Sequence, residues 1–340
     1  MSVTRRRAPL NPAASGTITG STLRDAAIAP STHYKYNRSL DKFLHYTRLS
    51  LSALLRRPAR VIDVLFSNYL EYEFHHHGSY HNSCHALNGL IFRCPRLRMK
   101  LGETRLRLRG WRRLYKHKSH PPFTWEITLL FASVMAKWGH HAEAVGMLLS
   151  FHCYLRVGEL TRLVYSDVLM PNDPRAGSAH TDMALRLQFT KTGAEQSVSI
   201  ESRLIARVLR GYLAAFPFLS DSHIFPFSPS SFRHLISQVA SSLGMGDIPY
   251  VPHSLRHGGA TYDFLRVRSI EQIMFRGRWV SMESARRYVQ TCKALLIRQQ
   301  VPQHLHDLGT QLGSGIEEVL TLLRESVEVE TRAAPSARRT

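Results

Sequence analysis

The chain has 340 residues, which is enough for two domains with hydrophobic cores of their own. Its 44% hydrophobic and 21% charged residues are typical of a soluble globular protein, but its net charge of +20 is not. An excess of this size favours a polyanionic partner, with nucleic acid as the first choice. Because no apolar run reaches about 18 residues and no hydrophobic core follows the basic start, we expect neither a membrane span nor a secretory signal.

The positive charge is concentrated in the first third of the chain. Residues 1–120 hold 22 Lys and Arg against 6 Asp and Glu, whereas residues 121–340 hold 23 against 19. The basic third also contains many aromatic and apolar residues, so we expect it to fold. Four scattered cysteines, none at the spacing of metal ligands, indicate a reducing compartment. The three histidines at 75–77 have no partner cluster, and we interpret them as a polar helix end in preference to a metal site.

Residues 1–30 are rich in Pro, Ala, Ser, Thr and Gly and are predicted to form a disordered basic arm. Over residues 31–118, apolar residues recur at helical spacing, which predicts three or four short helices in a compact module. The expected helices cover the segments YKYNRSLDKFLHYTRL, VIDVLFSNYLEYEFHHHG and SYHNSCHALNGLIFRC. Residues 119–125 contain two prolines and are predicted to be a linker.

The segment at the end of this module is strongly basic. Residues 93–118 carry eleven Lys and Arg but a single Glu. A solvated helix normally mixes both signs, so this bias predicts a face that meets phosphates, while the interleaved Leu and Trp residues hold the segment to its domain. The candidate DNA-binding residues are Arg98, Lys100, Arg105, Arg107, Arg109, Arg112 and Arg113.

Residues 126–310 are predicted to form a second domain, mainly α-helical with a small β-hairpin. The alternating segments ALRLQFT and QSVSI are joined by a Lys-Thr-Gly turn, which places Lys191 at the bend of the hairpin. The helices expected around it include HAEAVGMLLSFHCYLRVGELTRL, SIEQIMFRGRW and MESARRYVQTCKALLIRQQ. Residues 311–340 are expected to form an amphipathic helix, which could dock on a neighbouring protomer or cover the chain's own core, and a disordered tail.

Two pairs of polar residues stand at helical spacing. His253 and Arg256 are three residues apart and would share one face of a helix. Such a pair can hold an anion while a proton moves, although it could also be two residues on a solvated face. Arg156 and Glu159 have the same spacing, so that the carboxylate can hold the plane of the guanidinium group. The glycine pair at 258–259 leaves room either for a DNA backbone or for close helix packing.

Together with Lys191, Trp279 and Tyr288, these residues have the composition of a phosphate-binding site with a nucleophile. Two arginines can bind the non-bridging oxygens of a phosphate and neutralise the charge that grows in the transition state. A lysine and a histidine can move protons to and from the reacting oxygens. A tyrosine hydroxyl can attack phosphorus and hold it as a covalent ester. No metal or cofactor is required, because arginine and lysine already supply positive charge.

Over about residues 31–300 the sequence resembles the tyrosine recombinases, also called the phage-integrase family. The resemblance rests on YLRVGELTRLVYSDV, TKTG, HSLRHGGAT and GRWVSMESARRYV, in that order. It implies that the catalytic residues are Arg156, Lys191, His253, Arg256, Trp279 and Tyr288, with Glu159 as the acidic partner of the first arginine. The tryptophan stands where most members have histidine. The motif GRW around it is similar to the corresponding sequence in recombinases of eukaryotic mobile elements of the crypton and DIRS types.

The resemblance implies a two-domain DNA clamp, with a helical, SAM-like core-binding domain over residues 31–118 and a catalytic domain over residues 126–310. It also implies a site-specific recombinase or integrase that breaks and rejoins double-stranded DNA through a 3′-phosphotyrosyl intermediate, without metal or ATP. The working unit would be a homotetramer on two duplexes. The expected location is the nucleus in a eukaryote, and otherwise the cytoplasm with the nucleoid.

Three other functions use part of the same pattern. A type IB topoisomerase has the same constellation but relaxes supercoils as a monomer, so a plasmid relaxation assay and a two-site recombination assay separate it from a recombinase. A decayed mobile-element protein would bind DNA without cutting it, and would form no covalent adduct with a nicked suicide substrate. A histidine-rich metallohydrolase would lose its activity to chelators.

Overall fold

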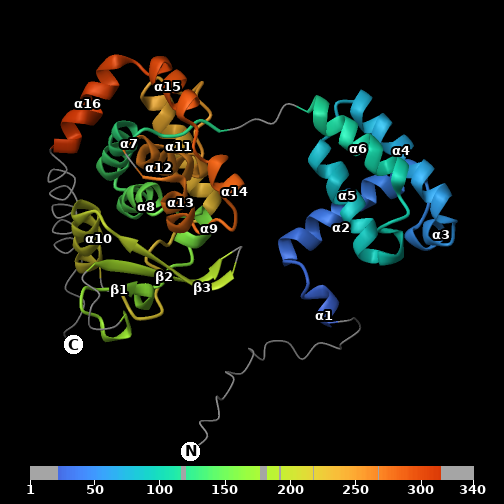
Figure 1. Cartoon of the computed structure of the whole chain (residues 1–340), viewed down its shortest axis with the longest axis horizontal. Helices are drawn as coiled ribbons and strands as arrows, with labels where there is room; N and C mark the ends of the chain where they lie inside the picture. Colours follow the sequence, from blue (N-terminus) through green and yellow to red (C-terminus); the bar gives the residue numbers. More distant parts are fainter. Residues whose placement is uncertain are drawn as a thin grey trace, which may run out of the picture. The chain divides into compact units, whose positions relative to one another are not determined.

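The computed structural model describes residues 22–115, 120–176, 182–190, 193–216, 218–266 and 268–314. The chain divides into two compact units, residues 1–118 and residues 119–340. As the sequence predicts, the structure is mostly helical with a small antiparallel sheet (Figure 1). Among the helices that the structure describes, none is long and apolar enough to cross a membrane.

Unit 1 consists of helices around one hydrophobic core, to which Phe43, Phe66, Leu90 and Trp111 contribute buried side chains. The three helices expected from apolar periodicity correspond to α2, α4 and α5 of the structure. The elements of unit 1 are α1 (Thr22–Asp25), α2 (Pro30–Thr47), α3 (Leu51–Leu55), α4 (Ala59–His75), α5 (Tyr80–Arg93), η1 (Pro95–Leu97) and α6 (Gly102–Leu114). Helix α4 ends within the histidine run, and the described residues hold no group of three or more side chains suited to a metal ion.

Helix α6 carries most of the basic segment and begins at a carboxylate from another helix. The N–H groups of Glu103 and Thr104 donate to the two oxygens of Asp63 in α4, at 3.0 and 2.9 Å. Such a cap satisfies N–H groups that have no partner inside the helix. Thr104, Leu108 and Trp111 are buried at helical spacing, which leaves Arg109, Arg112 and Arg113 exposed to solvent.

Unit 2 has a larger core, built mainly from α7, α8, α10, α11, α12 and the sheet. Its strands β1 (Val168–Leu169), β2 (Met183–Thr190) and β3 (Gly193–Ile200) pair antiparallel in that order. Thr190 is paired with Gly193, and the bend between them, with Lys191, lies outside the described residues. The helices of unit 2 are α7 (Trp125–Lys137), α8 (His141–His152), α9 (Val157–Leu160), α10 (Arg203–Ala215), α11 (Pro229–Ser242), α12 (Pro252–Leu265), α13 (Ile270–Arg276), α14 (Met282–Arg286), α15 (Thr291–Gln300) and α16 (Gln303–Ser314), with short turns η2 (Tyr165–Asp167) and η3 (Pro174–Ala176).

Three of the expected helices are wrong in their extent. The continuous helix expected over residues 141–163 is broken between α8 and α9, where Tyr154 has a φ of 49°. The helix expected at SIEQIMFRGRW ends at Arg276, which leaves Trp279 in a turn. The last helix is broken between α14 and α15, so Tyr288 also lies in a turn. The first two helices end with local hydrogen bonds: the N–H of Leu155 donates to the carbonyl of Ser150 at 3.2 Å, and that of Trp279 donates to the carbonyl of Met274 at 3.0 Å. The break before α15 instead involves Thr261 of α12, which bonds the backbone of Tyr288 and Gln290.

The segment before α7 belongs partly to the core of unit 2. Phe123 is buried, stacks on Tyr250 with ring centroids 4.1 Å apart, and donates its N–H to the carbonyl of Ser254 at 3.2 Å. The apolar ring therefore anchors the chain beside the start of α12. Residues 121–123, which belong to the segment predicted as a linker, are buried.

The glycine pair of α12 is explained by close packing of its own chain. A Cβ atom on Gly259 would lie 2.0 Å from the carbonyl oxygen of Phe151, and one on Gly258 would lie 2.4 Å from that of Phe123. Real Cβ atoms do not approach a backbone oxygen so closely. Of the two interpretations left open by the sequence, the structure favours helix packing, and this packing positions α12 against the end of α8.

We expect Gly259→Ala to destabilise unit 2 by about 3 kcal/mol, because the backbone on both sides must move apart to admit one methyl group. Urea unfolding measures the loss. Gly158→Ala is the matched control, since a Cβ at Gly158 meets nothing within 4 Å. An unchanged unfolding midpoint in Gly259→Ala would show that α12 is not packed as described.

Candidate active site

The first turn of α12 presents two of the predicted residues. Pro252 occupies the first turn of the helix, where its missing N–H is not needed, and the hydroxyl of Ser254 accepts the N–H of Val251 at 3.2 Å. His253 and Arg256 follow on this turn and both reach Tyr288. The rings of His253 and Tyr288 are 5.3 Å apart, and the Arg256 guanidinium carbon is 5.2 Å from the tyrosine ring.

Arg256 is fully buried, and backbone carbonyls hold it in place. Its Nη2 donates to the carbonyl of Gly277 at 2.6 Å, and its Nη1 donates to the carbonyl of Tyr154. The guanidinium carbon also lies 4.4 Å from the centre of the Trp279 ring. Arg256 thus joins the break after α8 to the turn after α13 and lies against both aromatic rings of the site.

Tyr288 owes its position to a break in the helix that the sequence pattern does not reveal. The hydroxyl of Thr261 in α12 donates to the carbonyl of Tyr288 at 3.3 Å and accepts the N–H of Gln290 at 3.0 Å. These bonds replace helical ones between α14 and α15. The tyrosine ring is half-buried, stacks on His257 at 4.6 Å and meets Trp279 at 4.6 Å.

Trp279 offers a buried hydrogen-bond donor to the site. Its side chain is almost fully buried, and among the described residues its Nε1 has no hydrogen-bond partner. A buried indole N–H normally has a partner, which makes this atom a candidate donor to a ligand oxygen. It can donate one hydrogen bond but cannot accept a proton.

Arg156 and Glu159 lie together at the start of α9. Arg156 precedes the helix with extended backbone, and Glu159 is in its first turn. The Arg156 Nη1 is 2.5 Å from Oε1 of Glu159, and the Arg156 N–H donates to Oε2 at 2.9 Å. The same Oε2 also meets Nη2 of Arg278 at 2.9 Å. Arg278 in turn reaches the carbonyl of Tyr154, which links this pair to Arg256.

The structure therefore brings five of the six predicted catalytic residues into one constellation with Glu159, while Lys191 lies outside the described residues. The sequence analysis did not find Arg278, His257 and Thr261, which complete the site. Arg278 could have been noticed only as the residue before Trp279 in the motif GRW. His257 is visible only as a neighbour of Arg256, and nothing in the local sequence singles out Thr261.

Charges in the site are strongly coupled. Burial opposes ionisation of Glu159, but the Arg278 charge and the Arg156 N–H and guanidinium outweigh it and hold the pKa of the carboxyl below its ordinary value. Burial, together with the charges of Arg156 and Arg278, lowers the pKa of Arg256 to about 9, so this side chain stays charged at neutral pH. Burial, followed by His257 and Arg256, lowers the pKa of His253 to about 4, so that its ring is neutral at neutral pH.

We expect unit 2 to lose stability as the pH falls from about 6.5 towards 4. Burial lowers the pKa of His253 and of His257 to about 4 and that of His152 to about 3, whereas the unfolded chain takes up these protons near pH 6.5. Their contribution to stability is therefore complete above pH 6.5 and lost on acidification. Urea unfolding at about pH 7.5 and 5.0 checks this, with the exposed His234→Gln as control; a midpoint that does not fall at the lower pH would contradict it.

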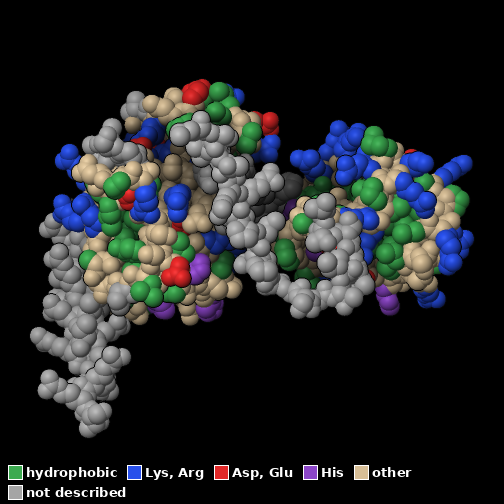
Figure 2. Space-filling model, turned by 90° about the horizontal axis from the view of Figure 1, so that it is seen from below, with side chains coloured by type: hydrophobic (Ala, Val, Ile, Leu, Met, Phe, Trp, Pro, Cys, Tyr) green, Lys and Arg blue, Asp and Glu red, His purple; other side chains and the backbone are tan. Residues whose placement is uncertain are grey.

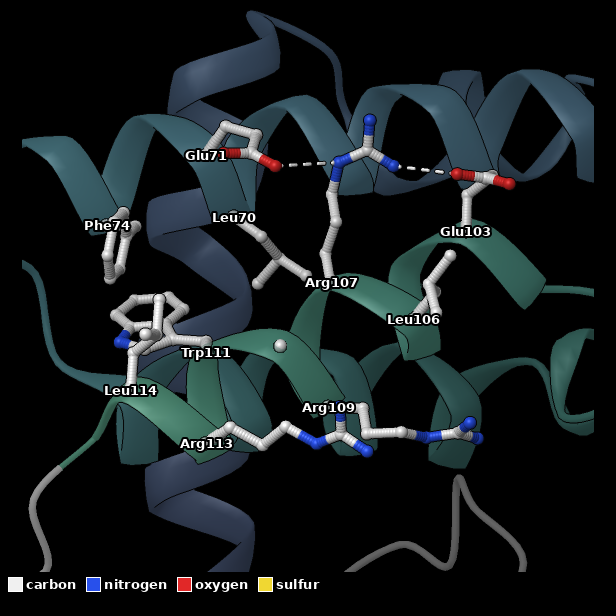
Figure 3. A pocket seen from close by; sticks show the side chains of 11 residues that line it. Leu70, Glu71, Phe74, Glu103, Leu106, Arg107, Arg109, Trp111, Arg113 and Leu114 are labelled. Carbon is white, nitrogen blue, oxygen red and sulfur yellow. Dashed lines mark hydrogen bonds and ion pairs between the residues drawn. The ribbon is translucent and has the colours of Figure 1, made fainter.

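The seven candidate DNA-binding residues of unit 1 differ in their freedom. Arg98, Lys100, Arg109, Arg112 and Arg113 are exposed, whereas Arg105 and Arg107 are half-buried. Arg107 lies between two carboxylates, with Nε 2.9 Å from Glu71 and Nη1 2.8 Å from Glu103 (Figure 3).

Arg109 and Arg113 extend from the other side of α6 (Figure 3). On the face shown in Figure 2, the Lys and Arg side chains of unit 1 are widely spread, with little Asp or Glu among them. The charge available to an external anion is therefore that of the exposed residues, and much less that of Arg107.

The chain shares its fold with a transposon integrase, and recombinases are also among its structural neighbours. The integrase of the Tn1549 transposon, in complex with transposon right end DNA, is 13% identical, with a TM-score of 0.50 over 80% of this chain and 94% of that one. The XerH site-specific recombinase bound to its difH substrate is 12% identical, with a TM-score of 0.48 over 81% and 78%. XerA recombinase is 18% identical, with a TM-score of 0.40 over 82% and 94%. Neither a protein-family model nor a curated protein sequence matches the chain.

Proposed function

We propose that this protein is a tyrosine recombinase that breaks and rejoins double-stranded DNA through a phosphotyrosyl intermediate. The observation that carries the proposal is the placement of Tyr288. Its ring lies against His253 and Arg256 from the first turn of α12 and against Trp279 from the turn after α13. A nucleophile, a proton acceptor, a fixed positive charge and a free donor thus meet in one place. The integrase that shares the fold is bound to transposon DNA, which supports DNA as the substrate.

The proposed cleavage step forms one bond and breaks one bond. The Tyr288 oxygen attacks phosphorus as its proton passes to the neutral His253 ring, and the bond between phosphorus and the 5′ oxygen breaks. The leaving oxygen takes a proton from Lys191, which gives a free 5′-hydroxyl and a 3′-phosphotyrosyl ester. Arg156 and Arg256 neutralise the charge of the pentacovalent state, and Nε1 of Trp279 donates to a non-bridging oxygen.

Rejoining reverses the step with the 5′-hydroxyl of a partner strand, so the bond energy is kept and no ATP is needed. We propose that the working assembly is a homotetramer on two duplexes, with unit 1 as the core-binding domain and unit 2 as the catalytic domain. A source in a mobile element is in keeping with the likeness to a transposon integrase.

A suicide duplex with a nick beside the scissile phosphate tests the function. The short 5′ fragment diffuses away after cleavage, so the covalent complex accumulates and is seen as a band of reduced mobility in a denaturing gel. Pooled random duplexes serve as the substrate, and sequencing of the trapped DNA gives the site. A two-site recombination assay and a plasmid relaxation assay then separate strand exchange from topoisomerase activity. Absence of any adduct would contradict the proposal.

We expect joint replacement of Arg109, Arg112 and Arg113 by Gln to weaken binding to all duplexes alike. The slope of log affinity against log salt should fall by about 0.9 for each phosphate contact that is lost. Arg107→Gln is the matched control, because Glu71 and Glu103 already neutralise that charge. Fluorescence anisotropy over a series of salt concentrations measures both variants. An equal loss in the control would place the DNA on the other side of α6.

A further inference from the structure

Arg278 occupies a backbone position that normally belongs to glycine. Helix α13 ends in a Schellman motif, in which the N–H of Trp279 donates to the carbonyl of Met274 at 3.0 Å and that of Arg278 donates to Phe275 at 3.0 Å. This motif requires a left-handed residue, and Arg278 has a φ of 57°. A residue other than glycine is strained in this backbone conformation. Strain of this kind at a candidate site points to a role for the side chain.

The side chain of Arg278 is buried and directed at Glu159. Its exposed fraction is 5%, against 22% for Arg156, and the Glu159 side chain between them is 4% exposed. Nη2 of Arg278 lies 2.9 Å from Oε2 of the carboxylate, and Nη1 of Arg156 lies 2.5 Å from Oε1. The carboxylate is thus held on its buried side by one guanidinium group, and the other guanidinium group faces the open side.

The three arginines and one carboxylate leave an excess of two positive charges in a buried site. This excess is unfavourable without an anion, since Arg156 and Arg278 both lower the pKa of Arg256. A phosphodiester carries one negative charge, and its pentacovalent state carries two. Because the site is buried, a charge at this position acts more strongly on the reacting phosphate than it would in water.

We propose that Arg278 is a positioning residue for phosphate binding, a role that rests on the proposed function. It holds Glu159 from the buried side, so that Arg156 is turned to the phosphate. It has no part in proton transfer and does not need to touch the DNA.

Arg278→Gly tests this role, because it removes the charge and suits the left-handed backbone. At saturating suicide duplex, we expect the rate constant of adduct formation to fall by about 100-fold while the Kd for DNA changes less than about threefold. Arg278→Lys keeps a charge in reach of Glu159 and should recover most of the rate. Arg48→Gly is the matched control, since Arg48 is an exposed arginine with a φ of 55° in unit 1.

The route through Glu159 is tested by a double variant. If Arg278 acts by holding this carboxylate, Arg278→Gly adds no more than about a threefold loss to that of Glu159→Gln. Full additivity of the two losses, or a wild-type rate in Arg278→Gly, overturns the inference. If the wild-type chain itself forms no adduct, the proposed function is wrong. If the wild type forms an adduct and Arg278→Gly forms it at the same rate, only the role proposed for Arg278 is wrong.

Discussion

Tyr288→Phe is expected to lower covalent adduct formation by about 10⁴-fold or more, because phenylalanine has no oxygen with which to attack phosphorus. The ring contacts with His257 and Trp279 need no hydroxyl, so the folding and DNA affinity of the variant should stay close to those of the wild type. The nicked suicide duplex measures the adduct, and mass spectrometry of the DNA-linked peptide identifies the attached residue.

Tyr262→Phe is the control for this experiment, since Tyr262 lies on α12 and is half-buried in the same unit. It should form adduct at the wild-type rate. An adduct that persists in Tyr288→Phe, or a peptide that carries DNA on another residue, would refute the assignment of the nucleophile and with it the order of events proposed above.

Arg256→Lys is expected to slow adduct formation by about 100- to 1,000-fold although it keeps the positive charge. A lysine cannot bind the carbonyls of Tyr154 and Gly277 together or lie flat against the Trp279 ring as the guanidinium group does. The loss of these buried hydrogen bonds should also lower the free energy of unfolding by about 2 kcal/mol. Single-turnover kinetics and urea unfolding measure the two effects separately.

Arg266→Lys provides a matched comparison for this change. Arg266 also lies over an aromatic ring, 4.4 Å from the centre of Tyr262, but it is exposed and outside the site. It should leave both the rate and the stability nearly unchanged. A wild-type rate in Arg256→Lys would mean that charge alone suffices at this position and that the fixed guanidinium plane has no part in binding the phosphate.

Apolar periodicity predicted helices correctly where a helix is stabilised by burial of its own apolar face. Helices α2, α4 and α5 follow the pattern of buried residues closely, and the hairpin of β2 and β3 follows from strict alternation. Periodicity failed where distant residues break a helix. The turns that hold Tyr154 and Tyr288 interrupt helical patterns, because Gly259 approaches the end of α8 and Thr261 binds the backbone beside Tyr288.

The same distinction holds for side chains. Order and spacing along the chain predicted that Arg156, His253, Arg256, Trp279 and Tyr288 belong to one site, and the structure places His253, Arg256, Trp279 and Tyr288 in mutual contact. They could not reveal that Arg278 shares Glu159, or that Arg107 is already neutralised by Glu71 and Glu103. The carboxylates that the sequence could not assign, Glu159 for Arg278 and Glu71 for Arg107, lie far along the chain from the arginine that they bind, whereas Glu103 precedes Arg107 by one helical turn.

By itself, the sequence determined the chemistry that this protein has at its disposal: a basic helical unit, a hairpin, two arginines, a histidine and a late tyrosine in a fixed order. Only the tertiary structure decided that Tyr288 lies in a turn against Arg256, and that a third arginine, Arg278, shares Glu159 with Arg156. The reason is physical, because local pattern governs which residues are buried in a helix, whereas the break before α15 depends on the hydroxyl of Thr261, which supplies hydrogen bonds from a distant helix.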